Sequence, residues 1–446
     1  MTDAPPRAKK SILRATLLVL PAHVVFGAGN AFLPILLSTF FGRSDATDVY
    51  QFAWAVFGFA GSLVFSAYQD SAIVPILAEE RLAHRKALPE LLGALLAHTW
   101  VIGGAIAIAV GAIAMGWFSL RYHGDQFRLA ATMVLPFCLF LVTMATRTFF
   151  ATLLAAEHHF FVQPIANGLG MVVNLGMLTL GHERFGVALI PTSALAGELV
   201  AALLLAWYAL RIVRIELRLG FTRPEPLRKF ARLIASEVGG GAVTRVNPVV
   251  DQLMAGLSGV VGAGTMLRYS GDVATLPTSI LQAALLPVLL SHLSDDFAAR
   301  DIAKFRATVV KALITVCLLM LGAAVVLYAV RGPLIRLVFL HGEMDAGGVD
   351  RMIAILPFHL VGLIPFGALL VLARAHVALK NSTIMLGMGI FNATCNAVFN
   401  VVLLRAIGLE GVALSTSSVY LAVAILFWFR FEARLAAIRA LPMGTA

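Results

Sequence analysis

Residues 91–120 read LLGALLAHTWVIGGAIAIAVGAIAMGWFSL, a run that contains no Asp, Glu, Lys or Arg. A helix that rises 1.5 Å per residue over this run is longer than the roughly 30 Å hydrocarbon core of a bilayer. Nine further uncharged runs of at least 18 residues occur, at 15–42, 49–69, 129–146, 158–182, 273–294, 312–330, 352–373, 382–404 and 411–429. Ten such runs predict a chain that crosses a membrane repeatedly as α-helices.

The composition also indicates that the solvent of this chain is a bilayer. Of its 446 residues, 60% are hydrophobic and 13% are charged, about half the charged fraction of an ordinary soluble domain. A soluble two-domain enzyme and a disordered chain are both excluded. The three cysteines, Cys138, Cys317 and Cys395, lie in separate apolar runs, so neither a disulfide framework nor a metal site is indicated.

Two further apolar segments raise the predicted number of spans to twelve. Both are interrupted by charges: about 187–210 by Glu198, and about 230–258 by Glu237, Arg245 and Asp251. When the 34 Lys and Arg residues are sorted by predicted loop, 22 fall on the side of the N-terminus and 8 on the other. Because cytoplasmic loops carry the excess of basic residues, both termini are predicted to be cytoplasmic.

The same distribution explains the formal net charge of +10. The basic residues are spread over short loops without aromatic interleaving or a nucleic-acid motif, so no nucleic-acid partner is expected. The longest basic loop covers about 211–230 and divides six spans from six. It predicts an N-terminal lobe at 1–220 and a C-terminal lobe at 221–446, related as parallel repeats.

Ionisable side chains within spans are concentrated in the second half. Each costs about 2.5 to 3.5 kcal/mol on insertion, so it usually faces water or an opposite charge. Arg268 and Asp272 stand at i and i+4 on one helical face. Two interpretations are open for this pair. It forms an internal salt bridge, or it lines a substrate cavity together with Glu237, Arg245 and Asp251.

The helix predicted at 230–258 carries two features that weaken or bend a helix, the Gly239–Gly241 run and Pro248. Such a break is tolerated in a membrane only where protein or a water-filled cavity surrounds it. The polar stripe Asn392, Asn396 and Asn400 repeats at one-turn intervals. It is typical of hydrogen bonding between helices, with a cation site as the alternative.

The spans of the first half contain fewer charged groups, which are Asp70, Arg147 and Glu198. For each, structural pairing or an interfacial position is the main interpretation and a cavity position the other. No Walker A motif and no other enzyme motif occurs. The chain is therefore predicted to be a transporter rather than an enzyme, with no catalytic residues.

Several segments, in order, resemble the lipid II flippase (MurJ/MviN) family of the multidrug/oligosaccharidyl-lipid/polysaccharide (MOP) exporter superfamily. They are FFGRSDATDVYQFA at 40–53, AIVPILAEER at 72–81, VVDQLMAGLSGVVGAGTMLRYSGDVATLPTSILQAALLPVLLSHLS at 249–294, PLIRLVFLHGEMDAGG at 333–348 and GLEGVALSTS at 408–417. The resemblance covers most of the chain. It implies two six-helix lobes around a cavity that opens alternately to each side of the bacterial inner membrane, and a polyprenyl-diphosphate saccharide as substrate.

The residues that the resemblance implies as functional match this chain unevenly. Asp48 matches an acidic residue of the family and is expected to act in gating. The family's Tyr-x-Asp-Arg motif corresponds to Tyr269–Asp272, so Asp272 holds the arginine position and Arg268 lies one turn earlier. The cavity arginines of the first two helices correspond to Leu33, Thr39 and Ser62, and an acidic residue after helix ten corresponds to Asn381. The family also has two more helices than the twelve predicted here.

These observations lead to a main hypothesis and two alternatives. The main hypothesis is an inner-membrane flippase for a lipid-linked anionic substrate, in which Arg245 and Arg268 bind phosphate and the acidic residues Asp251, Asp272 and Glu237 hold them or couple a cation. Gating or coupling is assigned to Asp48, Asp70, Asn381 and Asn396. No cofactor is expected, Na+ or proton coupling is left open, and the protein is expected to be a monomer among membrane lipids.

The first alternative is a MATE-like antiporter of small cationic or amphipathic compounds. Within the spans, the acids Asp70, Glu198, Glu237, Asp251 and Asp272 outnumber the arginines Arg147, Arg245 and Arg268. That balance suits a cationic substrate better than a diphosphate. The second alternative is a membrane scaffold that transports nothing.

Overall fold

The computed structural model describes residues 29, 31–67, 87–157, 159, 161–221, 245–284, 289, 292–293, 296–297, 301–379 and 383–440. Within these residues every regular element is helical. The chain separates into two compact units: unit 1 is Met1–Phe41 with Phe52–Val238, and unit 2 is Gly42–Gln51 with Gly239–Ala446. The predicted lobe boundary at 220/221 and the basic linker beyond residue 221 lie at or outside the edge of the described residues.

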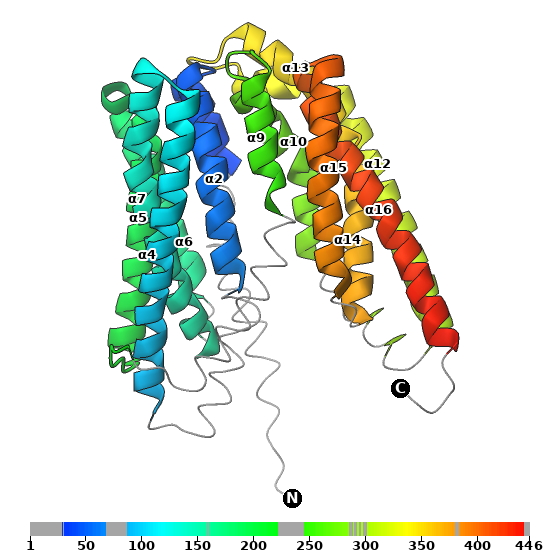
Figure 1. Ribbon diagram of the computed structural model, residues 1–446, viewed down its shortest axis with the longest axis horizontal. Helices are drawn as coiled ribbons and strands as arrows, with labels where there is room; N and C mark the ends of the chain where they lie inside the picture. The colour runs from blue at the N-terminus through cyan, green and yellow to red at the C-terminus, as the bar shows by residue number, and fades with distance from the viewer. Residues whose placement is uncertain are drawn as a thin grey trace, which may run out of the picture. The chain divides into compact units, whose positions relative to one another are not determined.

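Unit 1 is a bundle of long apolar helices (Figure 1). Its elements are a short helix at Ala31–Phe41, most of α2 (Asp45–Ala67), α4 (Leu88–Arg121), α5 (Gly124–Ala156), α6 (Val162–Phe185) and α7 (Leu189–Trp207), which continues into a π-helical turn at Tyr208–Ile212. Tyr122 and His123 alone connect α4 to α5. Gly124, with φ of 57°, allows this tight reversal. The two helices then pack against each other over their length.

The helices α6 and α7 approach each other at a pair of glycines. The chain reverses between them through a 3₁₀ turn at Gly186–Ala188. A Cβ atom on Gly170 would overlap the carbonyl oxygen of Gly197, and a Cβ atom on Gly197 would overlap that of Gly170. Small residues at such a crossing let two backbones come into direct contact, which stabilises helix pairs in a membrane by close packing.

An ion pair joins three helices of unit 1. The Arg147 guanidinium on α5 binds Glu198 on α7. Arg147 Nη1 also donates to Asn167 Oδ1 on α6 at 3.3 Å. The Arg147 and Glu198 side chains are only 13% and 15% exposed. The structural pairing that we expected for these two charges is therefore present, and each charge neutralises the other within the apolar surroundings.

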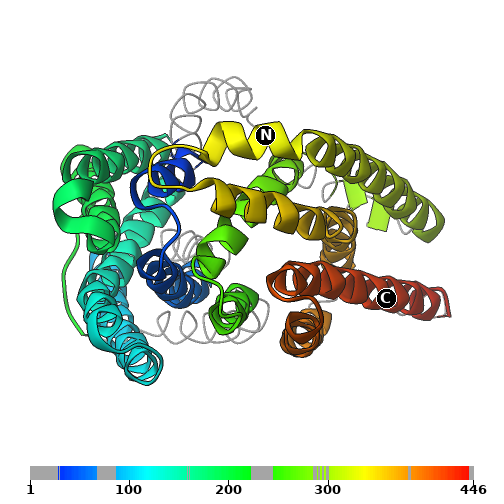
Figure 2. The same cartoon turned by 90° about the horizontal axis from the view of Figure 1, so that it is seen from above.

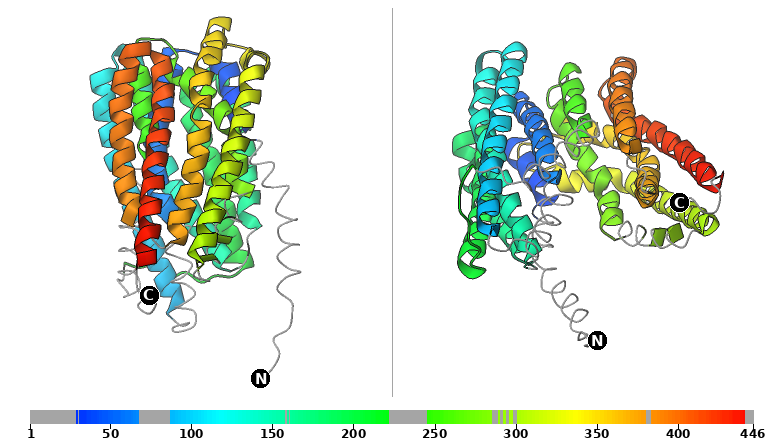
Figure 3. Two further views of the ribbon diagram at one scale, coloured as in Figure 1. Left: turned by 90° about the vertical axis from the view of Figure 1, so that its right-hand side faces the viewer. Right: turned by 60° about the horizontal axis from the view of Figure 1, so that its bottom comes forward.

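Unit 2 contains α9 (Asn247–Leu257), α10 (Ala263–Ala284), α12 (Ile302–Phe339), α13 (Ala346–Leu360), α14 (Leu363–Ala378), α15 (Thr383–Ile407) and α16 (Leu409–Ala440). The helix α14 packs against both α12 and α16, and α15 packs against α16. Figure 3 (left) shows these four helices alongside one another, and Figure 2 shows α15 and α16 as neighbours when viewed along the bundle.

The span predicted at 352–373 is broken in two. The helices α13 and α14 meet at a 42° bend. Gly362 stands at the bend, where a Cβ would lie 2.5 Å from Ser417 Oγ, and that hydroxyl donates to the Phe358 carbonyl at 2.6 Å. A side chain on α16 thus satisfies a carbonyl that the interrupted helix leaves free, which is a common cause of a stable kink.

Ion pairs hold the start of α13 in place. Asp345 precedes the helix and accepts a hydrogen bond from Gly348 N at 3.3 Å, which caps its N-terminus. Arg43 binds the same carboxylate through Nε at 2.6 Å and through Nη2 at 2.9 Å. The hydrogen bond from Arg43 holds the pKa of Asp345 below its usual range, so this carboxylate is charged at neutral pH. Two more pairs anchor α13: Arg336–Asp350 at 2.6 Å and Arg351–Glu410 at 3.5 Å.

The described helices identify a multi-pass membrane protein. Six helical segments are long and apolar enough to cross a bilayer, or seven when the bent pair α13–α14 is counted as one span. Large apolar side chains remain exposed along them, including Leu180 at 90% and Ile108 at 73%, as expected of surfaces that face lipid. The all-helical fold class is confirmed, whereas the number of twelve spans and the cytoplasmic termini remain predictions.

The contact between α6 and α7 leads to a stability prediction. Gly170→Leu should destabilise unit 1, whereas Gly176→Leu on the same helix should not, because no atom lies within 4 Å of a Cβ at Gly176. Overpacking typically costs about 1–3 kcal/mol, which corresponds to a fall in melting temperature of roughly 2 to 10 °C. Thermal unfolding of the purified protein in detergent measures this difference. Equal melting temperatures for the two variants would contradict the close helix contact.

Candidate functional site

The predicted pair Arg268 and Asp272 lies in the middle of α10. Arg268 Nε contacts both carboxylate oxygens of Asp272, at 3.0 and 3.1 Å. The two side chains are nevertheless 44% and 31% exposed. The pair therefore neutralises its own charges without being enclosed, and either partner is free to exchange the other for a charged group of a ligand.

Aromatic and imidazole side chains surround this turn of α10. Tyr269 is buried and stacks on Phe339 of α12, with ring centroids 5.5 Å apart. His359 of α13 lies against Gly271, and its Nε2 is buried without a hydrogen-bond partner among the described residues. His359 could not be singled out from the sequence, because one histidine in an apolar run carries no distinguishing pattern.

A second polar cluster surrounds Asp251 of α9. One carboxylate oxygen accepts hydrogen bonds from Asn396 Nδ2 at 3.0 Å and Asn400 Nδ2 at 2.8 Å, both on α15. The other oxygen accepts from Thr416 Oγ1 of α16 at 3.0 Å. One turn from Asp251, Asn247 and Asn392 are paired through their amides at 3.1 and 3.3 Å. The asparagine stripe on α15 thus faces α9 and joins three helices.

The hydrogen bonds to the Asp251 carboxylate all come from neutral side chains. Within the described part of the chain no basic side chain forms an ion pair with Asp251. Among the described residues the amide oxygens of Asn396 and Asn400, both fully buried, also have no donor. Each amide presents its NH2 group, not its oxygen, to Asp251, but a carboxylate beside neutral amide and hydroxyl groups has the chemistry that hard cations prefer. Either a monovalent cation or a proton would neutralise it.

A third carboxylate, Asp48, caps the start of α10. Its Oδ1 accepts hydrogen bonds from Thr265 N at 2.9 Å and Thr265 Oγ1 at 3.1 Å. These donors belong to the first turn of α10, where unpaired N–H groups and the helix dipole favour a negative charge. Asp48 itself lies in the first turn of α2, so the segment Gly42–Gln51 is bound to α10 through Asp48 and to α13 through Arg43.

The remaining predicted site residues are less informative. Arg245 is half-buried and lies two residues before α9. Asp70, Glu237 and Asn381 lie outside the described residues. Among the residues that the structure describes, no group of three or more His, Cys, Asp or Glu could hold a metal ion.

The fold matches solved membrane transporters over almost the whole chain. A structure of a lipid II flippase MurJ in an inward closed conformation superimposes with a TM-score of 0.77 at 18% identity, covering 96% of this chain and 90% of that one. An inward-facing multidrug resistance MATE family transporter of the MOP superfamily gives the same TM-score of 0.77 at 13% identity, covering 94% and 96%. The architecture is thus common to both groups.

The sequence comparisons match the lipid II flippase group. A probable lipid II flippase MurJ from Rhizobium tropici is 23% identical over 392 residues, which cover 85% of this chain and 73% of that protein. Lipid II flippase MurJ from Burkholderia cenocepacia is 25% identical over 398 residues, covering 85% and 76%. The family model "Lipid II flippase MurJ" matches residues 37–445. The chain therefore belongs to the lipid II flippase MurJ family.

Proposed function

We propose that this protein is an inner-membrane flippase that moves a lipid-linked anionic substrate, a polyprenyl-diphosphate saccharide of the lipid II type, between leaflets by alternating access. The observation that carries the proposal is the accessible Arg268–Asp272 pair in the middle of α10. An ionised pair is costly in a membrane helix, and one that stays open to solvent is suited to binding a charged ligand. The family membership supports a lipid-linked substrate.

The proposed binding step is an exchange of partners. A diphosphate offers Arg268 more negative charge than Asp272 does, and a planar guanidinium binds phosphate oxygens through two parallel hydrogen bonds. Asp272 would then be released toward a sugar hydroxyl or a bound cation. Arg245 is the second proposed phosphate ligand. Because Asp272 balances the charge of Arg268 in the free protein, the site costs little when no substrate is bound.

We further assign cation coupling to the Asp251 cluster. A Na+ ion or a proton bound there would balance the charge of Asp251. Binding of Na+ would require the amides of Asn396 and Asn400, which donate to Asp251 through Nδ2, to turn their oxygens toward the ion, and the Thr416 hydroxyl to release its hydrogen bond. The next residue, Gln252, extends toward α10, and its Nε2 donates to the Gly264 carbonyl at 3.1 Å. A change at Asp251 therefore has a short physical route to the helix that carries Arg268.

Gating is assigned to the segment Gly42–Gln51. The bonds of Asp48 to Thr265 and of Arg43 to Asp345 attach this segment to unit 2, whereas α2 continues into unit 1 from Phe52 onward. A helix shared in this way is suited to transmit movement between the units. Breaking these two attachments is the proposed event that accompanies opening of the transport cavity on the side of the membrane predicted to lie opposite the termini.

One observation supports the MATE-like antiporter as a second candidate. Once Arg268 and Asp272 are paired, the charge of Asp251 is left over, and a leftover negative charge would also suit a cationic substrate. The two candidates differ in which residue they require. The flippase depends on the positive charge at Arg268, and the antiporter depends on the acidic residues alone.

Arg268→Ala should reduce flipping of a lipid-linked saccharide by about tenfold to a hundredfold, because it removes charge-assisted hydrogen bonds worth about 1.5–3 kcal/mol. Arg268→Lys should retain part of the activity. The matched control is Arg331→Ala, at a half-buried arginine of unit 2 whose guanidinium lies over Tyr328. Transport is measured in proteoliposomes at equal protein abundance. Wild-type rates for both Arg268→Ala and Arg245→Ala would exclude this site.

Asp251→Asn should abolish the dependence of transport on the coupling ion while leaving the protein folded, because asparagine keeps the size and an acceptor oxygen. The measurement is the initial rate at stepped Na+ concentrations at fixed pH, and at stepped pH at fixed Na+. Asp350→Asn, at an ion pair 58% exposed on its acidic side, is the control and should behave as wild type. Unchanged ion dependence in Asp251→Asn would refute the coupling role.

A further inference from the structure

A hollow between α15 and α16 combines an apolar floor with two arginines. It encloses about 600 Å³ and is lined on α15 by Ile384, Gly387, Met388 and Phe391, and on α16 by Leu426, Arg430, Ala433 and Arg434. Arg430 and Arg434 are one helical turn apart on the same face of α16. Both are exposed, and among the described residues neither forms an ion pair.

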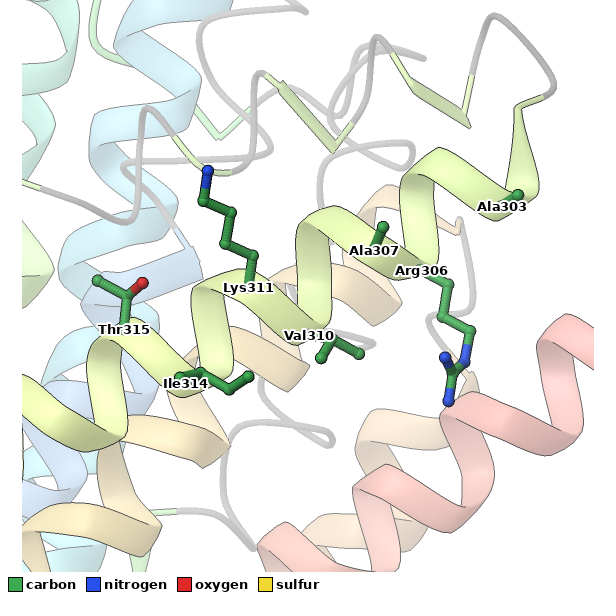
Figure 4. A pocket seen from close by; sticks show the side chains of 7 residues that line it. All are labelled: Ala303, Arg306, Ala307, Val310, Lys311, Ile314 and Thr315. Atoms are coloured by element: carbon green, nitrogen blue, oxygen red, sulfur yellow. The ribbon is translucent and has the colours of Figure 1, made fainter.

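A neighbouring hollow at the same end of unit 2 contains an arginine whose charge is balanced by a carboxylate. It encloses about 440 Å³ along α12 and includes Arg306 and Lys311 (Figure 4). Arg306 extends from α12 and binds Glu432 of α16 at 2.8 Å. Glu432 lies between Arg430 and Arg434 in sequence, but its carboxylate pairs with Arg306 on the other side of the helix. Among the residues that the structure describes, no carboxylate pairs with the two arginines above the apolar hollow.

The position of the arginines along α16 places them at the edge of the hydrocarbon layer. Residues 411–429 are uncharged, and at 1.5 Å per residue they extend about 28 Å, close to the thickness of a bilayer core. Arg430 is the first charged residue beyond this run and Arg434 lies about 6 Å further out. Leu426, Met388 and Phe391 continue the hollow toward the membrane interior. Phe429, 64% exposed, flanks it.

We propose that this hollow, the α15–α16 cleft, binds an anionic glycerophospholipid. The phosphodiester lies against Arg430 and Arg434, and one acyl chain fills the apolar floor. Two unpaired guanidinium groups at headgroup depth complement phosphate, and basic pockets between membrane helices on the cytoplasmic side bind anionic headgroups. By the predicted topology this end of α16 is cytoplasmic. The site is separate from Arg268 and Asp251, so it stands whether or not the protein flips its proposed substrate.

Gly387 offers a test of the acyl-chain half of the cleft. A Cβ atom at Gly387 would have no atom within 4 Å, so Gly387→Leu should fill the cleft without straining the helix and without touching either arginine. Arg430→Ala with Arg434→Ala removes the headgroup half. Arg439→Ala, on the same helix but outside the cleft, removes one positive charge and is the matched control for each single variant, Arg430→Ala and Arg434→Ala.

The experiment is native mass spectrometry of the full chain with phosphatidylglycerol or phosphatidylcholine added in known ratio. Each arginine should contribute about fivefold to the preference for phosphatidylglycerol, so the double variant should lose about 25-fold. Gly387→Leu should lower retention of the lipid but leave binding of soluble glycerophosphate unchanged. The proposal is overturned if the double variant binds phosphatidylglycerol as Arg439→Ala does. It is equally overturned if Gly387→Leu retains the lipid like wild type, or if glycerophosphate alone displaces the lipid at equal concentration.

Discussion

The free-energy cost of an ionised side chain in an apolar helix is the constraint on which the arrangement of this protein depends. Such a group costs about 2.5 to 3.5 kcal/mol or more unless water or an opposite charge is near. Arg147 and Glu198 meet the constraint between helices and are largely enclosed. Arg268 and Asp272 meet it within one helix and stay exposed. The first arrangement stabilises the bundle, whereas the second leaves a charged surface that a ligand can reach.

Asp251 meets the same constraint in a third way. It has three hydrogen-bond donors on two other helices but no basic partner in the described part of the chain. Hydrogen bonds spread its charge without cancelling it, and among the described residues no group donates to the buried oxygens of Asn396 and Asn400. A mobile cation is the natural complement of such a site. The adjacent Gln252 contacts the start of α10, so a change at the Asp251 cluster can be passed to the helix that carries Arg268.

Much of the fold could be predicted from sequence because uncharged runs of membrane length need only counting. Charges in or beside apolar segments can be located by the same count. Asp251 interrupts the segment at about 230–258, and Arg268 and Asp272 directly precede the uncharged run at 273–294. The partners could not be predicted, because Asp251 bonds to residues 145 and 165 positions away and one sequence carries no record of which helices are neighbours. The bend between α13 and α14 was not predicted, although the uncharged run 352–373 contains Pro357, Gly362 and Pro365, which permit a bend. The packing of Gly362 against Ser417 shows where it occurs.

Unit 2 is proposed to link a cation at Asp251 to an anionic substrate at Arg268. The most direct measurement is the affinity of the purified protein for a polyprenyl diphosphate at stepped Na+ concentration and stepped pH. Linkage between two sites typically changes affinity by about 5- to 150-fold. The affinity should shift by at least about fivefold with one of the two ions, and this shift should be absent in Asp251→Asn. An affinity that is the same at every Na+ concentration and every pH would contradict it.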